Sequence, residues 1–229
     1  TAVAGIIAAR AGNGLVIAGV APDARVQALR ACWSDGAGPT RCNTFTLGKA
    51  LNFAIMNGAK VVNLSLSGPA DRLLQTLLDT AAVRGMVVVG AADPLRSDGG
   101  FPASYPGVIA VAGTDRAQAP ASALFAPGAS IPTTMPGARW GFVSGPSYAA
   151  AHVAGLAALL AQLHPSANAA QLRESIRTVH QGGAANTAGV PGSAVAQAGN
   201  IDACATIARA TGACACSCPS ISAMKASRP

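Results

Sequence analysis

Strand-like segments alternate with helix-like segments through the first half of the chain. Apolar strands are predicted at 60–66, 86–89 and 108–112, and the last two are apolar at nearly every position. Helices are predicted at 45–57 and 72–84, where apolar residues recur three and four positions apart and a glycine follows. Strands that are apolar on both faces and alternate with helices are typical of parallel sheets. The pattern therefore predicts an α/β fold with three layers: a mostly parallel sheet with helices on both faces.

Weaker signals place the remaining elements. A strand is predicted over Arg25–Ala31, after the turn Ala21–Ala24, and a long Ala-rich helix follows Ser147 and should lie against the sheet. Shorter helices are predicted over 168–180 and 202–210. Together these elements complete a single packed unit.

Length and composition limit the choice of function. The 229 residues are enough for one sizeable core, which we place in a domain over 1–211 with a flexible Cys-containing tail over 212–229. The net charge is +7, but the basic residues are mostly isolated arginines with few aromatics beside them, so nucleic-acid binding is not predicted. The longest apolar stretch contains His152 and Gln162, so no membrane span is predicted.

The six cysteines fall into two groups. Cys32 and Cys42 flank a Gly-rich loop of a size that a disulfide can close. Cys204 and the run Cys214–Cys218 near the C-terminus could form oxidised pairs, hold a metal or remain free thiols; the run lacks the spacing of zinc knuckles, and no metal site is predicted. Paired cysteines favour an oxidising compartment, so the protein is predicted to be secreted, periplasmic or at the cell surface.

The most suggestive residue for chemistry is Ser147, in the turn Gly145-Pro-Ser147 that leads into the Ala-rich helix. Free N–H groups and the positive end of the helix dipole favour negative charge at a helix N-terminus. A serine placed there can attack a carbonyl group while the helix end stabilises the oxyanion that forms. The alternative is a serine that only caps a buried helix.

Several segments in order along residues 1 to about 210 resemble the subtilisin-like serine proteases (subtilases). The resemblance rests on Thr1–Gly5, Ala21–Ala24, Val62–Pro69, Phe101–Pro106, Val108–Ala112, Ala126–Gly128, Ser144–Gly155 and Gly199–Ala203. It implies a subtilisin-like fold and hydrolysis of peptide bonds by a Ser-His-Asp triad, which needs no cofactor. Structural calcium is left open.

By this resemblance Ser147 is the nucleophile. The segment Ser65, Leu66 and Ser67 would hold an extended peptide substrate through its backbone, as an added strand at a sheet edge. Ala91 and Ala92 would border the pocket for the residue before the cleaved bond.

The chain departs from the family pattern at the triad. The family's aspartate motif is absent, and its catalytic histidine should precede the position at which this sequence begins, Thr1. His152 matches the family's structural helix histidine, and the turn at Asp35 is in the wrong place for the aspartate. We therefore expect this chain to be N-terminally truncated and inactive alone, with the missing N-terminal segment of its parent protein as a partner.

A second departure concerns the oxyanion hole. The family usually has an asparagine donor after the Val/Ala-rich strand, and here Asp93 or Pro94 takes that position. Proline has no N–H, and a carboxyl group donates only when it is protonated. Asp93 is nevertheless kept as a candidate, because the type-2 prohormone convertases of this family use aspartate there.

Two other classes of function are considered. A pseudoprotease would keep the peptide-binding surface as a binding or scaffold module, which Asp93 and Pro146 favour. An N-terminal nucleophile hydrolase would use Thr1 and its own amine, but such enzymes are built on stacked antiparallel sheets.

Overall fold

The computed structural model describes residues 1–14, 17–34, 40–113, 119–176, 178–179 and 199–212. Its main sheet has the strand order β3-β4-β5-β6-β10-β9. The first five of these are parallel, and β9 runs antiparallel to β10. The strands are β3 (Val61–Leu64), β4 (Val87–Ala91), β5 (Val108–Ala112), β6 (Leu124–Phe125), β9 (Thr178–Val179) and β10 (Asn200–Ile201).

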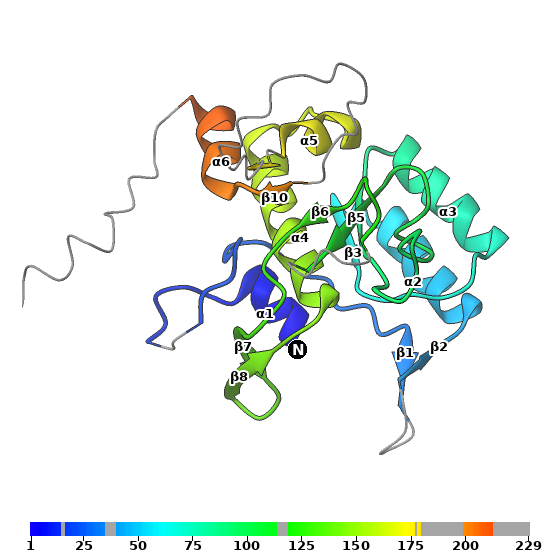
Figure 1. Cartoon of the computed structure of the whole chain (residues 1–229), viewed down its shortest axis with the longest axis horizontal. Helices are drawn as coiled ribbons and strands as arrows, with labels where there is room; N and C mark the ends of the chain where they lie inside the picture. The colour runs from blue at the N-terminus through cyan, green and yellow to red at the C-terminus, as the bar shows by residue number, and fades with distance from the viewer. Residues whose placement is uncertain (15–16, 35–39, 114–118, 177, 180–198, 213–229) are drawn as a thin grey trace, which may run out of the picture.

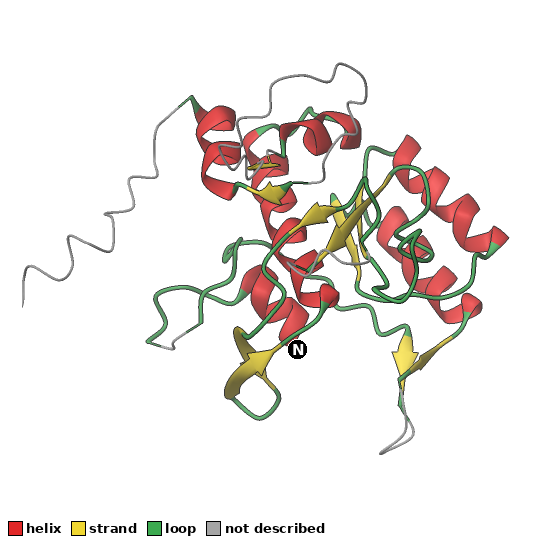
Figure 2. Cartoon of the chain, in the orientation of Figure 1, coloured by secondary structure: helices red, strands yellow, loops and turns green. Residues whose placement is uncertain are grey.

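Helices lie on both faces of this sheet (Figures 1 and 2). They are α1 (Ala2–Ala8), α2 (Thr44–Met56), α3 (Arg72–Val83), α4 (Pro146–Leu163), α5 (Ala169–Ser175) and α6 (Ala203–Thr211). Alternate side chains of β4 enter different cores: Val87 and Val89 pack with α4, whereas Val88 packs with α2 and α3. This double burial explains why the central strands are apolar at every position. The predicted three-layer α/β fold is confirmed.

Two antiparallel hairpins stand outside the main sheet. One pairs β1 (Cys32–Trp33) with β2 (Arg41–Cys42), and the other pairs β7 (Ile131–Met135) with β8 (Arg139–Val143). The second hairpin was not predicted. Its turn contains Pro136 and Gly137, a pair that marks turns and that the sequence analysis did not use, and it places Gly137 and Ala138 at φ values of 77° and 55°.

Helix α4 is the central packing element of the fold. It contacts α1, α5 and α6 and the strands β3, β4 and β5. Small residues allow these close contacts, and a Cβ added at Gly155 would lie only 2.7 Å from the Cβ of Val20. Val153 and Leu160 are fully buried beside them.

Two predicted elements need correction. Arg25–Ala31 is extended, but within the described residues it pairs with no other strand, and Arg25 to Arg30 are exposed. The helix predicted over 168–180 ends at Ser175, because Ile176 is buried in an extended conformation that leads into β9. His180, at the end of that prediction, lies outside the described residues. The predicted strands at 60–66, 86–89 and 108–112 and the helices at 45–57, 72–84 and 202–210 are confirmed to within a few residues.

Candidate active site

Ser147 is the second residue of α4, as predicted. Gly145 is the N-cap of the helix and has a φ of 140°, a conformation that favours glycine. Its N–H donates to the carbonyl of Gly128 at 2.7 Å, which fixes the chain as it enters the helix. Pro146 occupies the first helical position, where no N–H is needed. The Ser147 side chain is half-buried in the first turn of α4. The positive end of the α4 helix dipole lies at this end of the helix.

The end of β3 is joined to the start of α4 through Ser65. The Ser65 hydroxyl donates to the carbonyl oxygen of Ser147 at 3.0 Å and accepts from the side-chain amide of Asn63 at 2.8 Å. The Oδ1 atom of Asn63 is buried and has no hydrogen-bond partner among the described residues. The sequence analysis did not single out Asn63. Its signal was a polar residue inside an otherwise apolar strand, which points to a specific hydrogen bond.

The segments predicted to bind substrate lie at one edge of the sheet. Ser65, Leu66 and Ser67 follow β3, while Ala91 ends β4 and Ala92 follows it. The two strands are parallel neighbours, so their carboxyl ends meet at this edge. Gly68 then bridges to Phe101, the first residue of one of the segments on which the family resemblance rests. The fold thus brings these segments together, with Ser65 in direct contact with Ser147.

Asp93 accepts hydrogen bonds with both carboxylate oxygens. The Ser67 hydroxyl donates to Oδ2 at 3.1 Å, and the N–H of Leu95 donates to Oδ1 at 2.9 Å. A Cβ added at Gly100 would lie 2.7 Å from the Ser67 Oγ, so the loop closes tightly around this pair. Pro94 is exposed and offers no donor. Asp93 lies beside the predicted substrate-binding segment, but its two carboxylate oxygens act there as hydrogen-bond acceptors.

His152 is bonded to the backbone around it. Its Nδ1 lies 2.9 Å from the carbonyl oxygen of Tyr148, and the ring also hydrogen-bonds to the backbone of Pro127. Burial lowers the pKa of His152 below its usual value of 6.5, partly offset by these two bonds. The ring therefore serves packing, as predicted. His164 is exposed and caps the opposite end of the 18-residue helix from Ser147.

The lowered pKa of His152 predicts a pH-dependent stability. Because the unfolded chain binds a proton at His152 more readily, the free energy of unfolding should fall as the pH drops from about 6.5 towards the folded-state pKa. Urea unfolding at about pH 7.5 and about pH 5 should show this loss, and His152→Gln should reduce it. The carboxyl groups whose pKa is lowered, Asp71 and Asp98, start from 3.8 and titrate below this window. An unchanged pH dependence in the variant would contradict the assignment.

The remaining predicted sites are placed as follows. Cys32 and Cys42 form the predicted disulfide, which closes the β1–β2 hairpin. Cys204 is disulfide-bonded, whereas Cys214–Cys218 and Asp35 lie outside the described residues.

Thr1 is the N-cap residue of α1 and is exposed. Among the residues that the structure describes, no three His, Cys, Asp or Glu side chains gather as metal ligands, and no helix is long and apolar enough to cross a membrane.

Comparison with known proteins gives a single answer. The family model of the subtilase family matches residues 1–193. Subtilisin from Bacillus pumilus is 37% identical over 192 residues, which cover 78% of this chain and 68% of that protein. Subtilisin E from Bacillus subtilis (strain 168) is also 37% identical, and a thermophilic serine proteinase from Bacillus sp. (strain AK1) is 39% identical over 186 residues, or 77% of this chain. The chain spans only 49% and 45% of the length of these two relatives.

A solved structure described as proteases from Pseudoalteromonas arctica PAMC 21717 superposes with a TM-score of 0.75 and 27% identity, covering 92% of this chain and 70% of that one. The three-layer fold agrees with this likeness. This chain belongs to the subtilase family of serine-type peptidases.

Proposed function

We propose that residues 1–229 carry the nucleophile of a serine endopeptidase, and that Ser147 forms an acyl-enzyme with the substrate. In this mechanism the Ser147 Oγ attacks the scissile carbonyl, a histidine takes its proton, and that histidine then protonates the leaving amine. The free N–H groups at the start of α4 stabilise the oxyanion. The observation that carries the proposal is the placement of Ser147 in the first turn of α4, fixed by the Gly145–Gly128 hydrogen bond.

The described residues supply no base for this reaction. His152 is bonded to the carbonyl of Tyr148, and His164 caps the far end of α4. A serine hydroxyl without a base is a weak nucleophile. We therefore infer that the histidine and aspartate come from outside the described residues, in the N-terminal segment of a parent protein that the family resemblance implies, and that this chain alone is inactive.

The substrate in this proposal is an extended peptide. Ser65, Leu66 and Ser67 follow the end strand of the described sheet, where a peptide can add through main-chain hydrogen bonds. The small side chains of Ala91 and Ala92 would leave room for the residue before the cleaved bond. The Cys32–Cys42 disulfide supports a location outside the cytoplasm.

A pseudoprotease that binds peptides without cleaving them is the second candidate. One observation favours it: both oxygens of Asp93 accept hydrogen bonds, so this side chain donates none to an oxyanion while it is ionised.

The two candidates are separated by the coding sequence ahead of Thr1 and by the longer polypeptide that it encodes. The endopeptidase proposal expects an aspartate motif and a His-Gly pair there, and hydrolysis of an unstructured protein such as casein by the longer polypeptide. Residues 1–229 alone should leave casein intact. A longer polypeptide that lacks both motifs and binds casein peptides without cleaving them would establish the pseudoprotease.

Asp93→Asn is expected to raise the turnover of the longer polypeptide. An asparagine could keep the bond from Leu95 with its oxygen while it supplies an N–H donor near the oxyanion, and such a donor contributes roughly 100- to 1000-fold in rate. Steady-state kinetics on a peptide substrate measure the effect in kcat. Asp98→Asn, which changes the charge of the same loop, serves as the control and should leave kcat unchanged. An unchanged kcat for Asp93→Asn would mean that residue 93 does not face the oxyanion.

A further inference from the structure

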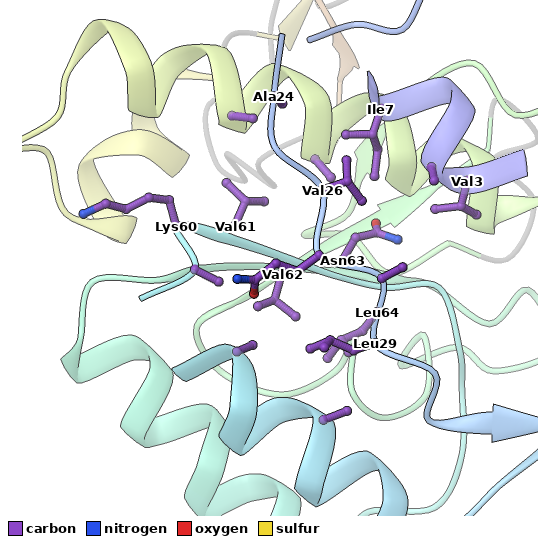
Figure 3. A pocket seen from close by; sticks show the side chains of 18 of the residues that line it. Val3, Ile7, Ala24, Val26, Leu29, Lys60, Val61, Val62, Asn63 and Leu64 are labelled. Carbon is purple, nitrogen blue, oxygen red and sulfur yellow. The ribbon is translucent and has the colours of Figure 1, made fainter. Parts of the chain in front are cut away.

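The segment that follows β3 turns its side chains in two directions. The Ser65 hydroxyl reaches the carbonyl of Ser147, and the Ser67 hydroxyl reaches the carboxylate of Asp93. Leu66, which stands between the two serines, instead lines a cavity of about 1320 Å³ beside β3 (Figure 3), and neither Ser67 nor Asp93 borders that cavity. This alternation is typical of an extended chain. Ser65 and Ser67 therefore share the side on which the nucleophile lies.

The loop that follows β4 is fastened to this segment at two points. The Ser67 hydroxyl donates to Asp93 at 3.1 Å, and the N–H of Gly68 donates to the carbonyl of Phe101 at 2.9 Å. A Cβ added at Gly100 would lie only 2.7 Å from the Ser67 Oγ, so a methyl group does not fit between them. The Ser67 side chain therefore fills the space between the segment and the loop.

The floor of this space is closed as well. Ala91 and Ala92 are only 5% and 3% exposed, and Gly99 and Gly100 are also buried. Pro120 covers one side, because a Cβ added at Gly99 would lie 2.7 Å from the Pro120 Cγ. Solvent reaches the walls of an open side-chain pocket, but it does not reach these residues. The place predicted for the residue before the cleaved bond is therefore shallow.

We propose that Ser67 and Asp93 restrict the residue before the cleaved bond to glycine, alanine or serine. A larger side chain would have to displace the Ser67 hydroxyl from Asp93 and push back a loop that Gly68 and Phe101 also hold. Forcing extra atoms into a packed space weakens binding by about tenfold or more. The inference rests on the proposed function, which assigns the substrate-binding segments, and it names the substrates as peptides with a small residue at this position.

Binding measures the restriction without any cleavage. The protein is the longer polypeptide carrying Ser147→Ala, so that no peptide is hydrolysed. Two fluorescein-labelled peptides, Lys-Val-Val-Ala-Ala and Lys-Val-Val-Ala-Phe, end in a free carboxyl group as a cleavage product does, and their binding is followed by fluorescence polarisation. We expect the alanine peptide to bind at least about tenfold more tightly. Equal binding, or tighter binding of the phenylalanine peptide, would overturn the proposal.

Ser67→Gly assigns the restriction to one side chain. This change removes the atoms that fill the space, so the affinity for the phenylalanine peptide relative to the alanine peptide should rise at least about tenfold. Ser97→Gly removes the same atoms from an exposed residue of the loop, and as the matched control it should leave the ratio unchanged. Each protein binds both peptides, so the ratio does not depend on the fraction that is folded. An unchanged ratio in Ser67→Gly would refute the role of Ser67.

Hydrolysis by the longer polypeptide with Ser147 intact gives a second reading. Internally quenched peptides with alanine or phenylalanine before the same bond should differ at least about tenfold in kcat/KM, in favour of alanine, and mass spectrometry identifies the bond that is cleaved. Preferential binding of the alanine peptide without cleavage of either substrate would support the restriction and contradict the proposed endopeptidase. Faster cleavage after phenylalanine would support the endopeptidase and disprove the restriction.

Discussion

Ser147→Ala is expected to lower kcat for peptide hydrolysis by about a million-fold in a polypeptide that joins residues 1–229 to the base and carboxylate of the proposed triad. The figure is the loss caused by removing the nucleophile of subtilisin, a relative of this chain. The physical reason is that no described hydroxyl can replace one held at the second position of α4. The activity that remains would come from peptide binding and the oxyanion site alone.

Ser144→Ala is the matched control for this experiment. Ser144 lies three residues earlier, and its hydroxyl accepts from the N–H of Ser130 at 2.9 Å, so its role is to hold the turn. Its loss should change kcat far less than the loss of Ser147. In residues 1–229 alone, a fluorophosphonate probe should label neither serine rapidly, as mass spectrometry of the digested protein can determine. Rapid labelling of Ser147 in the isolated chain would show that a base is already present.

Leu160→Ala should lower the free energy of unfolding by about 2–5 kcal/mol, the range for truncating a buried leucine. The Leu160 side chain is fully buried between α4 and the sheet, and neighbouring strands cannot move in to fill the space. For a domain of this size the melting temperature should fall by roughly 4–20 °C. Urea unfolding followed by circular dichroism gives the free energy directly.

Leu163→Ala supplies the comparison within the same helix. Leu163 is the last residue of α4 and is 41% exposed, so its truncation removes few contacts. We expect a loss well below that of Leu160→Ala. Equal losses at the two positions would mean that the inner face of α4 is assigned wrongly.

The layers of this fold could be predicted because the residues of each central strand show by themselves that both of its faces are buried. Val87–Ala91 and Val108–Ala112 are apolar on both faces, and only a sheet covered on both sides buries such strands. Arg25–Ala31 shows the limit of the method. Its residues favour an extended chain, which is what forms, but pairing depends on a neighbour that the local sequence does not specify.

The candidate site, too, could be predicted from the sequence only in part. The position of Ser147 follows from a turn and a helix start that are adjacent in sequence. The contacts around it do not, because the Ser65–Ser147 hydrogen bond joins residues 82 positions apart and the Ser67–Asp93 bond joins residues 26 apart. Sequence analysis placed Asp93 near the oxyanion, but only the structure shows that its carboxylate is already occupied as an acceptor.

The placement of Ser147 on α4 has a consequence for how such a chain can change over evolutionary time. The helix that presents the serine is also the one that most of the fold packs around, and Ala149, Ala150 and Ala151 in its first turns are completely buried. A lineage that gave up peptidase chemistry would be free to lose the hydroxyl of Ser147 but not the small residues behind it. The persistence of this motif in a sequence therefore records selection for folding, and only the hydroxyl itself records selection for catalysis.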